Sequence, residues 1–65
     1  MMIVKLINEL MQKQGKTIDD MIEITGLSHW IIEDIILNQV TPTPEQAKIM
    51  LGVLGVNLRD VLSLY

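Results

Sequence analysis

Helix-capping residues and turn residues divide this chain into short segments, and these boundaries constrain its fold more than any other feature. The clearest start is at Thr43, Pro44 and Gln46, which give a hydroxyl cap, a proline at the first helical position and an amide that completes a capping box. Glycines tolerate the left-handed conformation that ends many helices, and they follow three segments, as Gly15, Gly26 and Gly55. We predict five helices, the first ending near Gln14 and the others over 17–26, 28–37, 43–55 and 57–64.

Apolar residues recur at i, i+3, i+4 and i+7 within these segments, which gives each helix one inward face. The residues expected to point inward from the first four helices and from the turn at Gly26 are Ile3, Leu6, Ile7, Leu10, Met11, Ile18, Met21, Ile22, Leu27, Ile31, Ile32, Ile35, Ile36, Ala47, Met50, Leu51 and Leu54. The second and third helices are expected to be capped by Thr17 and Ser28, with Asn38 ending the third in a left-handed conformation. Asn57, followed three residues later by Asp60, is expected to cap the fifth.

The chain has 65 residues, of which 49% are hydrophobic, and it contains no cysteine. A domain of this size has marginal stability, and no disulfide can strengthen it, so helix packing must supply the stability. We predict a single all-α domain over 1–65. Apolar side chains that one small core cannot hide are expected on the surface, where they usually mark an interface.

The residue inventory argues against several classes of function. No apolar run reaches the ~18 residues of a membrane span, and the first residues lack a leader pattern, so we expect a cytoplasmic protein with no membrane partner. One histidine, no cysteine and no glycine-rich phosphate loop provide no catalytic set. We therefore expect no enzymatic activity, no cofactor, no metal site and no small-molecule ligand.

The segment from Thr17 to Leu37 has the layout of a helix-turn-helix, with two short helices joined around a glycine. The residues Lys16–Ser28 (KTIDDMIEITGLS) resemble the first half of this motif in the Cro/phage-repressor (XRE-type) family. The residues Thr41–Lys48 (TPTPEQAK), continuing to Leu54–Leu58, are similar to the fourth helix of that family and the turn after it. The resemblance covers nearly the whole chain.

The resemblance implies a five-helix, repressor-like bundle that binds operator DNA as a dimer, with the third helix in the major groove. Carried over by position, the residues that would read the bases are His29, Trp30, Glu33, Asp34 and Leu37. The start of the second helix, around Thr17, would touch phosphate. Members of the family tend to carry small polar, amide or basic residues on the base-reading face, and this chain departs from that pattern.

Helical geometry places the same five residues on the arc opposite the isoleucines of the third helix. Trp30 and Leu37 form an apolar centre flanked by Glu33 and Asp34, which suits a protein partner. Carboxylates are repelled by phosphate, although one can accept a hydrogen bond from cytosine. Several alternatives stay open: Trp30 folding back on its own domain, Glu33 and Asp34 serving as a solvated face, and His29 being an ordinary first-turn residue.

Two further sets of residues are candidates for contacts. Lys13 and Lys16 lie near the start of the second helix, where they could contact phosphate with modest, salt-sensitive affinity. The sharper interpretation of the apolar residues along the last two helices is a homodimer seam, and the alternative is that they cover the edge of the core. These residues are Ile49, Val53, Leu64 and Tyr65.

Two functions from different classes follow. The first hypothesis is a small transcriptional regulator of phage or mobile-element type that binds operator DNA through the third helix. The alternative is a helix-turn-helix fold reused as a protein-binding module, such as an antirepressor or the partner of another regulator. Fold alone does not decide between them.

Overall fold

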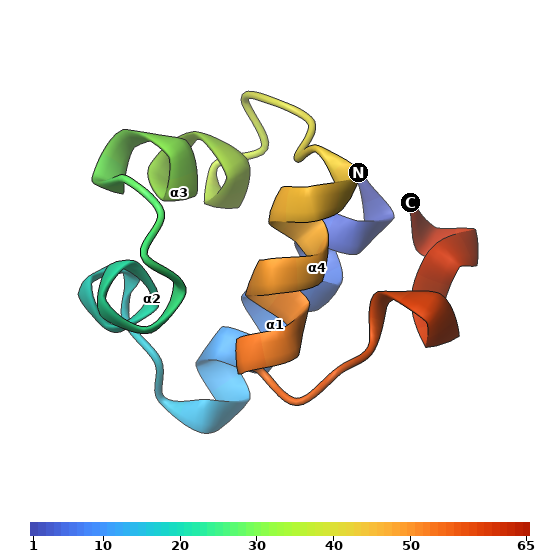
Figure 1. The fold of residues 1–65 in the computed structure, drawn as a ribbon, viewed down its shortest axis with the longest axis horizontal. Helices are drawn as coiled ribbons and strands as arrows, with labels where there is room; N and C mark the ends of the chain where they lie inside the picture. Colours follow the sequence, from blue (N-terminus) through green and yellow to red (C-terminus); the bar gives the residue numbers. More distant parts are fainter.

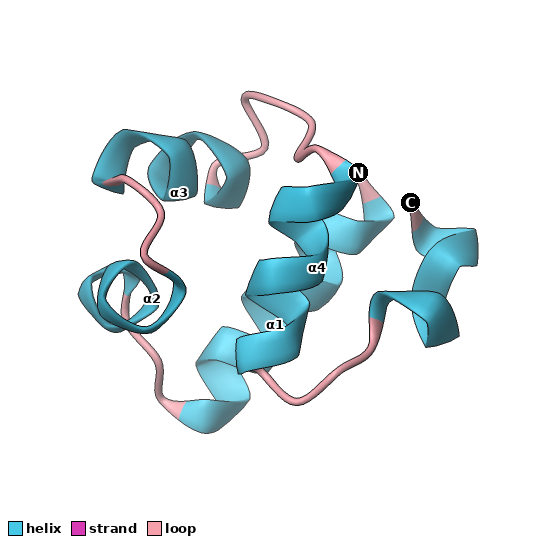
Figure 2. Ribbon diagram, viewed as in Figure 1, coloured by secondary structure: helices cyan, strands magenta, loops and turns pink.

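The computed structural model describes all of residues 1–65 and is entirely helical, which confirms the predicted all-α fold. Four α-helices are followed by one 3₁₀ helix: α1 (Met2–Gln14), α2 (Ile18–Thr25), α3 (His29–Ile36), α4 (Pro44–Val53) and η1 (Leu58–Leu64). Only turns and loops join them (Figure 2). None of the five has the length and apolar content needed to cross a bilayer.

The helices α1 and α4 lie side by side at the centre of the molecule, with α2 and α3 to one side and η1 to the other (Figure 1). Figure 1 shows α2 end-on and α3 lengthwise, so these two helices cross steeply. They pack on each other and are joined by a turn over residues 26–28, which is the helix-turn-helix arrangement expected for 17–37. This arrangement places α3 at the surface, at the opposite end of the molecule from η1.

The structure contains the local hydrogen bonds that the predicted starts of α2 and α4 require. Thr17 and Asp20 form a complete capping box at α2, and Thr43 and Gln46 form another at α4. Asn38, two residues beyond the end of α3, has a φ of 59°, as expected for a left-handed stop. The glycines at 15, 26 and 55 also have positive φ, so the left-handed conformation predicted at these positions is confirmed.

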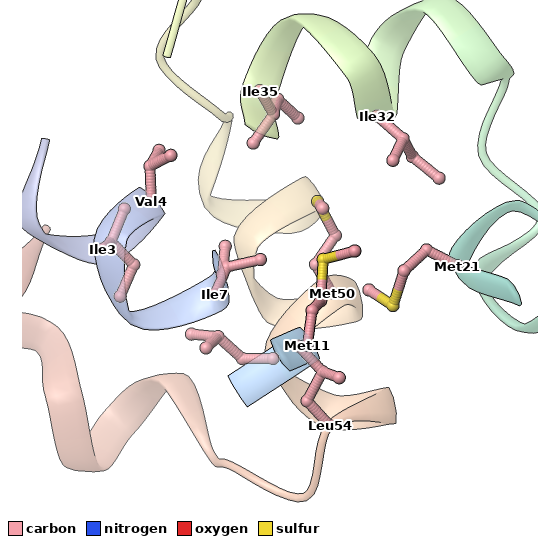
Figure 3. Close-up of a cluster of buried hydrophobic side chains, with 10 residues drawn as sticks. Ile3, Val4, Ile7, Met11, Met21, Ile32, Ile35, Met50 and Leu54 are labelled. Atoms are coloured by element: carbon pink, nitrogen blue, oxygen red, sulfur yellow. The ribbon is translucent and has the colours of Figure 1, made fainter. Parts of the chain in front are cut away.

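The core lies between α1 and α4 and extends under α2 and α3 (Figure 3). Met21 from α2 and Ile32 from α3 are fully buried members of this core, and Met21 points toward Met50 on α4. The buried cluster consists of Ile3, Val4, Ile7, Met11, Met21, Ile32, Ile35, Met50, Leu51 and Leu54. Several residues predicted to point inward are only partly buried at its edge, namely Leu6, Leu10, Ile18, Ile22, Leu27, Ile31 and Ile36.

The fifth helix has the 3₁₀ form and not the α form. Leu58, Val61 and Leu64 all pack against the core, and they lie three residues apart. A 3₁₀ helix has three residues per turn and therefore places them on one side. The backbone of Val61 (φ −129°) interrupts the segment. Asn57 caps it through the N–H of Arg59.

The expected cap at Ser28 is only partly correct. Ser28 has the extended backbone of a cap residue, but its hydroxyl makes no cap hydrogen bond and is buried without a partner. The hydroxyl of Thr25 accepts a hydrogen bond from the N–H of Leu27 and donates one to the carbonyl of Met21. The turn before α3 is therefore held by the side chain that ends α2.

Candidate binding surface on the third helix

Packing against two other helices fixes which side of α3 faces outward. Ile32 and Ile35 are fully buried beneath it, so the opposite side must point to solvent. At the C-terminal end of α3, the carbonyl of Ile36 accepts a hydrogen bond of 3.0 Å from the side-chain amide of Asn8 on α1. The core and this hydrogen bond together give α3 a single orientation.

The predicted outward residues of α3 lie on the surface of the structure. We call them the α3 face: His29, Trp30, Glu33, Asp34 and Leu37. The side chain of Trp30 is 68% exposed and that of Leu37 is 56% exposed. Trp30 does not fold back on its own domain, so that alternative is wrong. Positions 30, 34 and 37 follow i, i+4 and i+7, which places an apolar residue at either end of one stripe with a carboxylate between them.

The only ion pair in the structure lies on this face. The Nε2 atom of His29 is 2.9 Å from Oε2 of Glu33, one helical turn away. Both side chains are well exposed, and an exposed pair of this kind contributes little to stability. Its effect is local, because it draws the Glu33 side chain toward the start of α3.

The two carboxylates of the α3 face occupy an unfavourable position on their helix. The C-terminal end of a helix carries partial negative charge, which favours cations and disfavours carboxylates. Glu33 and Asp34 both belong to the second half of α3, which has no acidic residue in its first turn and no basic residue in its last. Residues placed where they lower stability, as these two carboxylates are, are characteristic of functional sites.

The charge of the whole helix-turn-helix unit is strongly negative. Residues 17–37 contain five acidic residues and no lysine or arginine, so their formal charge is −5 with histidine neutral. The other residues contain three acidic and five basic side chains, a charge of +2, and the two values add to the −3 of the chain. The acidic residues of the unit are Asp19, Asp20, Glu23, Glu33 and Asp34. A protein surface that meets DNA is usually basic.

The N-terminus of α2, where the resemblance places a phosphate, already holds carboxylates. The Asp20 carboxylate accepts the backbone N–H of Thr17 at 2.9 Å, and Asp19 also lies in the first turn. The hydrogen bonds from Thr17 are the main cause that lowers the pKa of Asp20, and the charge of Lys16 adds to it. Asp20 is therefore ionised at neutral pH and competes with a phosphate for this site.

The two lysines proposed to contact phosphate lie at the junction of α1 and α2. Lys13 is exposed in the last turn of α1, and Lys16 is half-buried after the helix ends. The backbone N–H of Lys16 donates to the carbonyl of Met11, which fixes the chain at this point. Neither lysine has an ion-pair partner. They are the only basic side chains that lie near the helix-turn-helix unit in the sequence.

The residues of the predicted homodimer seam are partly covered by their own chain. Val53 and Leu64 pack against the core, and Ile49 is half-buried. The hydroxyl of Tyr65 donates a hydrogen bond to the carbonyl of Pro42 and so ties the end of the chain to the loop before α4. Val53 and Leu64 thus cover the edge of the core, as the alternative states, and the homodimer seam stays a prediction.

Comparison of the chain with family models, with curated proteins and with solved structures found no match. Membership of the Cro/phage-repressor family therefore stays a prediction. The sequence held one further signal, which is the absence of every lysine and arginine between Thr17 and Leu37. The charge of each segment reveals this absence, and the net charge of the whole chain does not.

Proposed function

We propose that this protein is a binding module that docks another protein through the α3 face. The observation that carries the proposal is the exposed indole of Trp30, which shares a helix face with Leu37 and two carboxylates. Tryptophan is enriched among the residues that anchor protein interfaces. The formal charge of −5 on the unit opposes a polyanionic partner.

The chemistry of the α3 face defines the partner it fits. Burial of an exposed side chain the size of Leu37 contributes about 1.5–3 kcal/mol, and burial of Trp30 supplies a larger apolar area. Glu33 and Asp34 complement lysine and arginine, which favours a partner that carries basic side chains beside an apolar pocket. Ile24 and Val40 are also exposed, and they precede and follow α3 in the chain.

Affinity capture from extracts of the source cells, with the immobilised protein as bait, tests this function. A specific partner should be retained by the wild type and lost with Trp30→Ala. Met2→Ala is the matched control, because Met2 is an exposed apolar residue on α1 and not on the α3 face. The proposal fails if the same proteins are retained by wild type and Trp30→Ala, or if retention is abolished by nuclease.

The second candidate is the regulator that binds operator DNA. It is favoured by the outward orientation of α3 within the helix-turn-helix and by the unpaired Lys13 and Lys16 beside the start of α2. In this case the protein would act as a homodimer on a two-fold operator. Each subunit would offer few phosphate contacts, so binding would be modest and sensitive to salt. Both candidates are proposed to act in the cytoplasm.

Fluorescence anisotropy tests the DNA candidate. Labelled duplexes that tile the DNA around the coding region would be titrated at about 50 and 200 mM salt. Binding to one tile with a steep salt slope, weakened by the double substitution Lys13→Gln and Lys16→Gln, would support an operator. No binding to any tile at the lower salt would count against it, and in that case the protein-docking function is favoured.

A further inference from the structure

A second surface, at the opposite end of the molecule from α3, has the complementary chemistry. Two adjoining hollows of about 420 and 270 Å³ lie where α4 meets η1, and they share Lys48, Asn57 and Leu58. Arg59 and Leu62 complete the lining of the second hollow. We call this continuous surface the α4–η1 groove. It brings two of the five basic residues of the chain to one place.

The cations of this groove have no acidic partner within the molecule. The contact between His29 and Glu33 is the only ion pair, so neither Lys48 nor Arg59 is paired with a carboxylate. Beside them, Leu62 is 57% exposed although it is a large apolar side chain. An exposed leucine that lines the same hollow as two unpaired cations is suited to an acidic surface that also carries an apolar anchor.

We infer that the α4–η1 groove binds the α3 face of a second copy of this chain. The α3 face carries two carboxylates and the exposed Trp30, and the groove carries two cations and the exposed Leu62. Contact between the two surfaces would pair opposite charges at the rim and cover both apolar residues. The inference rests on the proposed function, because it names one protein partner for the α3 face.

The position of the two surfaces determines how copies would associate. The helices α3 and η1 make no contact with each other, and α1 and α4 lie between them (Figure 1). A molecule 28 Å long therefore cannot cover its own groove with its own α3 face. Copies would instead add head to tail, which produces a ring or an open chain and leaves one surface of each kind at the ends of an open chain.

Charge reversal on each surface tests the inference by sedimentation equilibrium, over a range of protein concentrations at about 50 mM salt. The mass of the wild type should rise above that of the monomer with concentration and fall toward it at about 500 mM salt. The double variant Lys48→Glu with Arg59→Glu should associate roughly a hundredfold more weakly, because two acidic surfaces would then face each other. The double variant Glu33→Lys with Asp34→Lys should be equally weak, because two basic surfaces would face each other.

An equimolar mixture of the two double variants is the decisive sample. The basic α3 face of one variant then meets the acidic groove of the other, while the remaining pair of surfaces is that of the wild type. Association should be restored in the mixture. The matched control for the groove variant is Lys5→Glu with Lys13→Glu, which has the same net charge and should associate like the wild type. Circular dichroism of every variant should match the wild type, because all substituted side chains are exposed or half-buried.

Several outcomes overturn the inference. They are a wild type that stays monomeric at every concentration, reversed variants that associate as the wild type does, and a mixture that shows no recovery. If the wild type is monomeric but captures another protein through Trp30, the inference is wrong and the proposed function stands. If no partner of any kind depends on Trp30, both are wrong.

Discussion

Thr17 and Asp20 are joined by two reciprocal hydrogen bonds at the start of α2. The backbone N–H of Thr17 donates to the Asp20 carboxylate at 2.9 Å, and the N–H of Asp20 donates to the Thr17 hydroxyl at 3.1 Å. Both are groups that a phosphate at this helix end would otherwise compete for. The contact that caps the start of α2 therefore occupies the groups with which this helix end could hold a phosphate.

This capping box should make the stability of the protein depend on pH. The pKa of Asp20 is lowered in the folded state, so its carboxylate stabilises the fold above the ordinary aspartate pKa. The contribution is lost as the pH falls through the lowered value. We expect Asp20→Asn to be less stable than the wild type at neutral pH and to approach it in acid. Urea unfolding at a series of pH values measures the difference.

The chain contains a matched control for this effect at the start of α4. Thr43 and Gln46 form a box of the same geometry, with hydrogen bonds of 3.0 and 3.1 Å, but the amide does not ionise. The loss in the free energy of unfolding caused by Gln46→Ala should therefore be the same at every acid pH. A difference between Asp20→Asn and the wild type that is also constant with pH would contradict the explanation.

Asp34 should destabilise the helix on which it lies. Its carboxylate is near the negative end of α3, so Asp34→Asn should raise the free energy of unfolding by about 0.3–1 kcal/mol at low salt. The gain should shrink as salt is added. Glu45→Gln provides the opposite case, because Glu45 lies in the first turn of α4, where a carboxylate is favourable. Chemical unfolding that gives both variants the same sign would be inconsistent with the helix-dipole argument.

The two sides of α3 should respond very differently to truncation. Ile32 is fully buried, and Ile32→Ala should cost about 2–5 kcal/mol, which is enough to unfold much of a marginally stable domain. Trp30 is largely exposed, and Trp30→Ala should change stability by no more than about 0.5 kcal/mol. Thermal unfolding compares them. A large loss of stability in Trp30→Ala would mean that the indole serves the fold and not an interface.

Removal of the two carboxylates from the α3 face separates the two candidate functions. If α3 entered the major groove, the double substitution Glu33→Ala with Asp34→Ala would strengthen binding to duplex DNA, because repulsion by phosphate would be relieved. If α3 docks a protein, DNA binding should be unchanged or absent. Anisotropy at low salt measures this directly, and a clear gain in affinity would favour the DNA candidate.

The features that could be predicted from the sequence are those that depend on neighbouring residues. The capping boxes at Thr17 and Thr43 form between residues three apart, and the left-handed backbone of Asn38 is a local preference. The outward position of Trp30 followed from the buried isoleucines on the same helix. In each case a short stretch of sequence contains both partners of the interaction.

The features that the sequence does not predict depend on packing between distant segments. The sequence predicts Ser28 as the cap of α3, but its hydroxyl is buried in the turn, and Thr25 makes the hydrogen bonds there. The 3₁₀ form of the last helix depends on how Leu58 and Leu64 meet the core. The groove that brings Lys48 near Arg59 depends on the angle between α4 and η1, which no local pattern specifies.

Photo-crosslinking from position 30 in living cells tests most directly whether the α3 face meets protein. With Trp30 replaced by a benzophenone-bearing amino acid, irradiation should give a discrete protein adduct that is absent when the same group replaces Met2. An adduct at a whole multiple of the monomer mass would identify further copies of this chain, and an adduct of any other mass a different protein. An adduct with DNA, or no adduct that depends on position 30, would contradict the protein-docking function.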